Sequence, residues 1–348
     1  MKGITYYQPG VIRTEEVVTP EIAADELLLK VHSSAICGTD LRIYKNGHFK
    51  IAEGESRILG HEVSGEISKV GKEVTGFAVG ERVATIPNIG CGHCRACIGG
   101  FNQLCKDYDA FGINLDGGFA EYMKIPAAAL RGHNVVKLPD ELSYQEATLI
   151  EPFSCAYNSY KQLQTKPGDT VLIIGAGPIG ACHVIINKLA GAAQVIVADL
   201  EDKRLSEIRD FGADITINSG TADLPAKIAE ITEGRGVDVI ITACSVPALQ
   251  QQALEMAAIH GRINFFGGLP QGKNIVPLDT NLIHYKELLV LGTTGSSIED
   301  YMKSLDLAKA EKVKLAKLVS KEFTLDEAQE AFDYALAGQG MKSLFRVE

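Results

Sequence analysis

Four cysteines within fifteen residues form the most specific pattern in this chain of 348 residues. They are Cys91, Cys94, Cys97 and Cys105, with the spacing C-x2-C-x2-C-x7-C. Four thiolates so close together can fill the tetrahedral shell of a zinc ion and leave no position open for chemistry, so we expect a structural zinc site that cross-links a loop. An iron–sulfur cluster is the alternative, but the last spacing and the absence of Pro after Cys105 fit the ferredoxin pattern poorly. His93 is then a bystander, because the cysteines fill the shell.

A second, dispersed set of residues could hold a metal with an open position. Cys37, His61, Glu62 and Glu151 supply sulfur, nitrogen and oxygen donors. A catalytic zinc takes about three protein ligands of these kinds and keeps one position for water or substrate. From residue types alone the grouping is weak, because Cys37 could be a buried core thiol and His61 a core histidine with satisfied hydrogen bonds.

A strand, a glycine motif and a helix follow one another in the middle of the chain. Residues 171–174 are apolar and mostly β-branched, which indicates a buried parallel strand, and GAGPIG follows at residues 175–180. The order G-x-G-x-x-G permits a tight turn, close approach of a pyrophosphate and close packing of a helix whose N-terminus holds the phosphates. A glycine-rich turn that serves packing alone is the alternative. The expected cofactor contacts are Gly175, Gly177, Pro178, Ile179 and Gly180.

Asp199 indicates which dinucleotide binds. It ends a second apolar run at residues 195–198 and lies nineteen residues after Gly180. A carboxylate at this place accepts hydrogen bonds from the adenosine ribose diol and repels a 2′-phosphate, so the expected cofactor is NAD.

The length and the pattern of elements indicate two domains of different class. Residues 1–150 contain short β-branched runs separated by Gly and Pro, and residues 166–292 alternate strands with helical patterns, which predicts an α/β doubly wound parallel sheet. Beyond them we expect a helix over residues 297–311, a last helix from a capping box at Thr324 and Glu327, and a final strand near Phe345.

Composition excludes several classes of partner. The net charge of −10 makes nucleic acid or an anionic membrane surface an unexpected partner. No apolar run approaches the length of a membrane-spanning helix, and the N-terminus lacks the pattern of a signal peptide, so we expect the chain to stay in the cytoplasm.

Taken together, the motifs resemble those of the zinc-dependent medium-chain dehydrogenase/reductase superfamily, in its sorbitol, threonine and galactitol-phosphate dehydrogenase branch. The resemblance covers essentially the whole chain and implies a GroES-like β-rich catalytic domain at residues 1–155 and 293–348, with a structural zinc lobe at about 90–106 and a Rossmann domain at 156–292. It also implies two zinc ions per chain, NAD, an active site in the cleft between the domains, and a homodimer or homotetramer. The resembling motifs are CGTD (37–40), GHE (60–62), the four-cysteine lobe, GGFAEY (117–122), LIEP (149–152), GAGPIG (175–180) and VAD (197–199).

The resemblance also implies roles for single residues of the metal site. Cys37 and His61 become catalytic zinc ligands, Glu62 contacts the metal directly, and Glu151 either binds the metal or bonds to its water. Thr39 is the expected first proton acceptor from a secondary alcohol.

Three further residues receive roles from the same resemblance. Asp40 organises the loop that carries CGTD. Lys342 matches a basic residue that approaches the pyrophosphate, and Arg204 matches one that lines the adenosine site. Lys342 and Arg204 could equally be exposed charges.

One departure from the family pattern bears on the substrate. Threonine dehydrogenases have a histidine of the proton relay where this chain has Arg42, and a permanently charged guanidinium is a poor proton shuttle. Arg42 and Tyr44 lie in a run, RIYKNG, that looks like the corresponding loop of galactitol-phosphate dehydrogenase. We therefore expect a polyol or polyol phosphate, with threonine as the alternative, and a non-catalytic or zinc-free role is disfavoured because every ligand position is kept.

The same loop is basic in an otherwise acidic chain. Lys45, His48 and Lys50 follow Arg42, and such a cluster beside a zinc site could recognise a phosphate or carboxylate. A solvated loop is the alternative.

Overall fold

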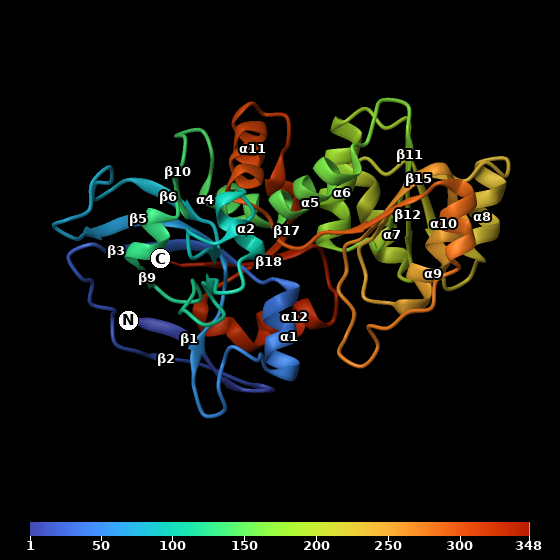
Figure 1. Cartoon of the computed structure of the whole chain (residues 1–348). Helices are drawn as coiled ribbons and strands as arrows, with labels where there is room; N and C mark the ends of the chain where they lie inside the picture. The colour runs from blue at the N-terminus through green and yellow to red at the C-terminus, as the bar shows by residue number, and fades with distance from the viewer. Residues whose placement is uncertain (348) are drawn as a thin grey trace. The chain divides into compact units, whose positions relative to one another are not determined.

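The computed structural model describes residues 1–347, which divide into two compact units (Figure 1). Unit 1 contains Met1–Glu151 and the segment from Ser296 onward, and unit 2 is Pro152–Gly295. The first division falls inside helix α5 (Ile150–Leu163), after its second residue. None of the described helices is long and apolar enough to cross a membrane.

Unit 1 is built from β-sheets. The largest sheet has the order β10-β6-β5-β3-β18-β17, and β9 also pairs with β3; a second sheet has the order β2-β1-β4, and β7 pairs with β8. The strands are β1 (Lys2–Gln8), β2 (Val11–Glu16), β3 (Leu27–Ala35), β4 (Arg57–Ile58), β5 (Glu62–Val70), β6 (Arg82–Thr85), β7 (Asn88–Ile89), β8 (Asp109–Ala110), β9 (Tyr122–Ile125), β10 (Val135–Lys137), β17 (Val319–Phe323) and β18 (Lys342–Arg346).

Helices cover parts of these sheets. Phe332 on α12 and the buried Phe119 and Phe345 make edge-to-face contacts in the core of the unit. The helices are α1 (Gly38–Asn46), α2 (Arg95–Ile98), α3 (Ala127–Arg131), α4 (Tyr144–Thr148), α11 (Ile298–Lys309) and α12 (Ala328–Leu336), with 3-10 turns η1 (Asn102–Leu104), η3 (Leu315–Leu318) and η4 (Leu325–Glu327).

Unit 2 contains a parallel sheet of six strands in the order β13-β12-β11-β14-β15-β16. The chain runs outward from β11 in one direction and then returns to continue in the other, which is a doubly wound topology. The predicted fold class, a β-rich domain with a Rossmann domain, is therefore confirmed. The strands are β11 (Thr170–Ile174), β12 (Gln194–Asp199), β13 (Ile215–Asn218), β14 (Val237–Thr242), β15 (Ala257–Phe265) and β16 (Leu289–Gly292).

Helices pack on both faces of this sheet. Alternate side chains of β11, Leu172 and Ile174, share one core with α8, α9 and α10, and Figure 1 shows α9 and α10 next to one another. Ile173 points to the opposite face and lies near Gly180 of α6. The helices are α6 (Pro178–Leu189), α7 (Asp202–Glu207), α8 (Leu224–Ile231), α9 (Pro247–Met256) and α10 (Thr280–Lys286), with a 3-10 turn η2 (Ile208–Phe211).

One segment differs from its predicted form. The residues after Cys37 form helix α1 and not a loop, because Asp40 accepts the N–H of Cys37 and completes a capping box. At the other end of the chain, Thr324 and Glu327 form the capping box that the sequence predicted, although the first turn is η4 and the α-helix begins at Ala328.

Candidate metal centres and cofactor site

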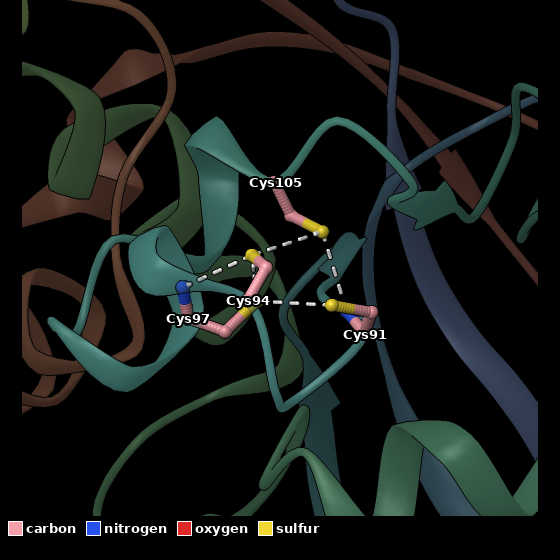
Figure 2. A group of neighbouring side chains, drawn as sticks. All are labelled: Cys91, Cys94, Cys97 and Cys105. Carbon is pink, nitrogen blue, oxygen red and sulfur yellow. Dashed lines mark hydrogen bonds between the residues drawn. The ribbon is translucent and has the colours of Figure 1, made fainter.

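The four cysteines of the lobe lie around one point (Figure 2). The Sγ atoms of Cys94 and Cys97 are 3.5 Å apart, those of Cys94 and Cys105 are 3.8 Å apart, and those of Cys91 and Cys97 are 4.0 Å apart. Four sulfurs held at a Zn–S distance of about 2.3 Å in a tetrahedron would be about 3.8 Å from one another. The spacing therefore fits a zinc ion and is far too long for disulfide bonds.

The backbone of the lobe holds the sulfurs in place. The N–H of Cys97 points at Cys94 Sγ at 3.5 Å and lowers the pKa of that thiol to about 7, while the N–H of Cys91 donates to Cys105 Sγ at 3.4 Å. A β-carbon at Gly90 would lie 2.6 Å from Cys97 Sγ, so a larger residue there would displace the sulfur. Burial raises the pKa of Cys97 to about 12 and also raises the pKa of Cys105, so these two thiols need a bound cation to ionise. The contacts hold the four sulfurs in a fixed array, as a structural metal requires.

A second donor group is formed by Cys37, His61 and Glu62, whose ligand atoms lie within 4.8 Å of one another. Cys37 caps α1, and Glu62 is the first residue of β5. His61 and Glu62 are buried, and Cys37 is half-buried. Gly60 has φ of +92°, and a β-carbon there would lie 2.4 Å from the Phe119 ring, so the chain reaches His61 through a turn that only glycine fits.

Asp40 fixes the geometry of this donor group. Its buried carboxylate accepts the N–H of Cys37 at 2.8 Å and the N–H of Gly60 at 3.2 Å, and it lies 3.5 Å from His61 Nδ1. Nδ1 therefore faces the carboxylate and leaves Nε2 for a metal, which is the usual arrangement of a metal-binding histidine.

The negative charge around this donor group favours binding of a cation. Burial by itself lowers the pKa of His61, but the charges of Asp40 and Cys37 outweigh it and raise that pKa well above its ordinary value. His61 Nδ1 is also a buried nitrogen without a hydrogen bond of good geometry. The residues fit a zinc ion, because they combine mixed S, N and O donors with surplus negative charge.

Lys342 lies against this group. Its Nζ donates to both carboxylate oxygens of Glu62, at 2.5 and 2.6 Å, and the lysine is buried. The sequence predicted a different partner for Lys342, the cofactor pyrophosphate. That contact stays a prediction, and it would compete with the ion pair. The strand sequence KSLFR does not mark Lys342 as buried, and it does not indicate Glu62 as the partner of this lysine.

Glu151 lies near the donor group without belonging to it. Among the described residues, the ligand atoms that converge within 4.8 Å are those of Cys37, His61 and Glu62. Glu151 is buried on α5. Burial raises the pKa of Glu62 and the charge of Lys342 lowers it, while the nearby charge of Glu151 raises it. That Glu151 binds the metal, or forms a hydrogen bond with the metal's water, stays a prediction.

Three other predicted residues lie on α1. Thr39 is half-buried in the first turn, and Arg42 is exposed and has no hydrogen bond or ion pair with the part of the chain that the structure describes. Tyr44 packs against Phe332, with ring centroids 5.2 Å apart, and its hydroxyl accepts a hydrogen bond from Gln329. Tyr44 therefore packs against α12. Its predicted contact with substrate stays a prediction.

Two members of the basic cluster after Arg42, Lys50 and His48, already have partners within the chain. Lys50 donates to the backbone oxygen of Tyr108 and lies 3.6 Å from the centre of that ring. His48 accepts the N–H of Lys50. Burial lowers the pKa of His48, and the charges of Lys50 and Arg42 lower it further, so the three groups share one region of positive potential.

The glycine motif of unit 2 has the geometry of a phosphate cradle. Gly175 has φ of +118°, and a β-carbon at Gly180 would lie 2.0 Å from the Gly175 oxygen, so both positions need glycine. A β-carbon at Gly177 would meet nothing within 4 Å. Gly177 is the N-cap of α6, Pro178 opens that helix and Ile179 follows, so the open space lies at a helix N-terminus.

Asp199 ends β12 beside this motif. One carboxylate oxygen accepts the N–H of Ala176 at 2.7 Å, and the other accepts the N–H groups of Leu200 and Glu201 at 2.7 and 3.1 Å. The carboxylate is fixed and half-buried, with lone pairs left for a ribose diol. Arg204 is half-buried on α7, within one turn of the helix N-terminus. The residues fit a dinucleotide.

Two family models match the chain. Residues 23–140 match the alcohol dehydrogenase GroES-like domain, and residues 178–310 match the zinc-binding dehydrogenase domain. The chain is 36% identical to sorbitol dehydrogenase of Bacillus subtilis (strain 168) over 97% of its own length and 94% of the relative. The chain belongs to the zinc-type medium-chain dehydrogenases.

Another relative of this zinc-type dehydrogenase differs in its named substrate. The L-threonine 3-dehydrogenase of Pseudoalteromonas atlantica (strain T6c / ATCC BAA-1087) is 33% identical over 93% of each chain.

Solved structures of similar proteins cover the same whole length. An alcohol dehydrogenase (rspB) from E. coli CFT073, complexed with NADH, has a TM-score of 0.91 at 32% identity over 99% of each chain. A zinc-binding dehydrogenase from Sinorhizobium meliloti 1021, bound to NADP, has a TM-score of 0.90 at 30% identity over 99% of this chain and 98% of the other. Galactitol-1-phosphate dehydrogenase from Escherichia coli has a TM-score of 0.89 at 30% identity over 99% of this chain and 100% of the other.

Proposed function

We propose that this dehydrogenase transfers hydride between NAD and a secondary alcohol or ketone, and that the alcohol belongs to a polyol or a polyol phosphate. The observation that carries the proposal is the donor group of the half-buried Cys37 and the buried His61 and Glu62, in the unit that matches the GroES-like domain. Its mixed donors are those of a catalytic zinc and not of a closed structural site.

The chain's residues would hold two zinc ions in different ways. Cys91, Cys94, Cys97 and Cys105 would enclose one ion completely, so that ion would stabilise the lobe. Cys37 and His61 would hold the other, with Asp40 orienting both residues, and Glu62 and Glu151 are the carboxylates near this group. When bound, the second ion acts as a Lewis acid on the alcohol oxygen, and NAD accepts the hydride.

Unit 2 selects and orients the cofactor. The N-terminus of α6 and the open backbone at Gly177 receive the pyrophosphate. Asp199 accepts the ribose hydroxyls and repels a 2′-phosphate, which favours NAD over NADP although similar proteins hold either. Arg204 lies on the adenosine side of this site.

Thr39 handles the proton. Its hydroxyl lies two residues after Cys37 in the first turn of α1, half-buried, where Oγ1 can accept the alcohol proton and pass a proton on by way of the cofactor ribose. Arg42 follows one turn later, and a guanidinium is a poor proton shuttle, so the relay does not continue through it.

Substrate class follows from the relatives and from Arg42. The sorbitol dehydrogenase relative supports a polyol, and galactitol-1-phosphate dehydrogenase supports a phosphorylated one. The exposed guanidinium of Arg42 could pair with a phosphate. L-threonine is the second candidate, on the strength of the threonine dehydrogenase relative.

The cellular setting is part of the same proposal. Sulfur distances of 3.5 to 4.0 Å leave the four lobe cysteines unbridged, which supports a reducing compartment such as the cytoplasm. We also propose a homodimer or homotetramer, as the family resemblance implies.

A substrate panel tests the proposal. Polyols, polyol phosphates, sugar acids and L-threonine are each offered with NAD, and formation of NADH is measured. The highest kcat/KM is expected with a polyol or polyol phosphate. A highest value with L-threonine would favour the alternative, and no turnover with any alcohol by zinc-loaded protein would overturn the proposal.

A further inference from the structure

A polar side chain lies in an inner strand of the parallel sheet of unit 2. Asn264 is the second-to-last residue of β15, between Ile263 and Phe265, and it is 0% exposed. Asparagine is depleted in strands, and a buried amide costs free energy unless its polar groups are paired. Its Oδ1 has no hydrogen-bond partner among the residues that the structure describes. What this amide contributes must therefore come from the hydrogen bonds that its NH2 group donates.

The NH2 group of Asn264 connects two segments that are far apart in the chain. Nδ2 donates to Ser159 Oγ at 2.6 Å and to Thr293 Oγ1 at 2.8 Å. Ser159 is fully buried on α5, and Thr293 is the first residue after β16. The side chain of Asn264 thus ties the segment that leaves the last strand of the sheet to a buried helix residue.

A second asparagine holds the same segment by its backbone. Asn158 is adjacent to Ser159 on α5, is buried, and donates from Nδ2 to the Gly295 oxygen at 3.0 Å. Thr294 lies between the two held residues and is exposed. Residues 293–295 are therefore fixed on both sides of a residue that faces away from the core.

The topology of the sheet indicates what this segment borders. Ligands of doubly wound sheets bind outside the carboxyl ends of the strands, where the strand order reverses. The glycine motif and Asp199 lie at the carboxyl ends of β11 and β12, which assigns the adenosine half of a dinucleotide to that side. The nicotinamide half is then expected beyond the carboxyl ends of β14, β15 and β16, where residues 293–295 begin.

We infer that Asn264 is a positioning residue for the nicotinamide half of the cofactor, which acts by fixing Thr293 and the segment 293–295. This inference rests on the proposed function, because it presumes that a dinucleotide binds. An apolar residue could fill the same space without an unpaired carbonyl, but it could not hold the two hydroxyl groups. The local strand preference is broken at the place where the ligand is expected, which is typical of a residue kept for function.

Two ligands separate positioning from folding. NADH carries the nicotinamide ring and ADP-ribose lacks it, and titration calorimetry measures the Kd of each. Asn264→Leu keeps the volume and removes both hydrogen bonds, so Kd for NADH should rise about tenfold, as expected for loss of one or two neutral hydrogen bonds, while Kd for ADP-ribose stays unchanged. The kcat for alcohol oxidation should also fall, because the ring is less well oriented.

Asn187→Leu is the matched control. Asn187 is also 0% exposed in unit 2 and also makes two hydrogen bonds, with Thr165 Oγ1 and the His183 oxygen. It lies near the C-terminal end of α6, and the phosphate cradle lies at the N-terminal end. Asn187→Leu should therefore lower the melting temperature and leave both Kd values unchanged.

Thr293→Val keeps the inference testable if Asn264→Leu does not fold. It removes the acceptor of the same hydrogen bond with little change of shape, and it should show the same selective loss of NADH affinity. Equal weakening of NADH and ADP-ribose would mean a structural role alone, and unchanged NADH affinity with unchanged kcat would also overturn the inference. A wild type that binds both ligands while the variants show either result refutes only the role of Asn264. A wild type that binds neither ligand refutes the proposed dinucleotide site.

Discussion

The carboxylate of Asp199 accepts a hydrogen bond of 2.7 Å from the backbone N–H of Ala176, which ties the end of β12 to the glycine motif. The other oxygen accepts two further backbone N–H groups. A charge fixed in this way can discriminate between cofactors, because it cannot turn away from a 2′-phosphate without breaking these bonds.

Replacement of Asp199 should therefore change cofactor choice. Asp199→Ala removes the acceptor of the ribose diol and the repulsive charge, so KM for NAD should rise roughly 10 to 100 fold, as expected for loss of a charged hydrogen bond, while use of NADP should improve. Steady-state kinetics with both cofactors measure the effect, and the exposed Asp210→Ala is the control. A wild type that prefers NADP would contradict this role.

Two glycines of the same motif should respond differently to alanine. A β-carbon at Gly180 would lie 2.0 Å from the Gly175 oxygen, so Gly180→Ala should lower the melting temperature as well as cofactor affinity. A β-carbon at Gly177 would meet no protein atom, so Gly177→Ala should fold normally and lose affinity for NAD alone. Thermal melting and NAD titration separate the two effects. Normal NAD affinity in Gly177→Ala would show that the pyrophosphate does not lie there.

His183 should weaken the protein in acid. It is fully buried on α6, both ring nitrogens lack hydrogen bonds, and burial lowers its pKa to about 3. Below pH ~6.5 His183 binds a proton in the unfolded chain but not in the folded chain. The contribution of the neutral His183 to the free energy of unfolding is therefore present above that pH and is lost as pH falls toward 3.

His183→Leu removes this penalty. Its stability relative to the wild type should increase by about 2 kcal/mol between pH 7 and pH 5, since each pH unit is worth about 1.4 kcal/mol. Urea unfolding at both pH values measures the difference, and His93→Leu on the exposed surface of the lobe is the control. A constant difference across this range would mean that His183 takes up its proton equally in the folded and the unfolded chain.

Arg42 should matter only for charged substrates. If its free guanidinium pairs with a phosphate, Arg42→Ala should raise KM for a polyol phosphate roughly 10 to 100 fold and leave neutral polyols nearly unchanged. Lys303→Ala, which removes an exposed lysine of α11 outside this basic cluster, is the control. Equal effects on charged and neutral substrates would show that Arg42 does not bind an anion.

Sequence alone predicted the parts of the molecule that are encoded locally. The lobe is recognisable because all four donors lie within fifteen residues. The β11-to-α6 turn is recognisable because an apolar run, spaced glycines and a following acid each have a physical reason at their position.

Features that depend on distant pairing were not predictable in the same way. Lys342 and Glu62 are 280 residues apart, and only the order of β5, β3 and β18 brings them together. The sequence predicts a loop at helix α1 because the strongest start signal of this helix is a contact of Asp40 with Cys37, a residue type that seldom caps helices. The short strand β17 has a polar centre, Ser-Lys-Glu, so its sequence has no alternation of apolar and polar residues that would predict a strand.

The catalytic role of Cys37 is tested most directly by zinc content and alcohol oxidation measured on the same samples. We expect about two zinc ions per chain in the wild type, and about one in Cys37→Ser, with a normal melting temperature and no NAD reduction by alcohols. Cys94→Ser, the matched variant of the four-cysteine lobe, should instead lower the melting temperature. A Cys37→Ser protein that still oxidises alcohols, or an active wild type whose only zinc lies in the lobe, would contradict catalysis at Cys37, His61 and Glu62.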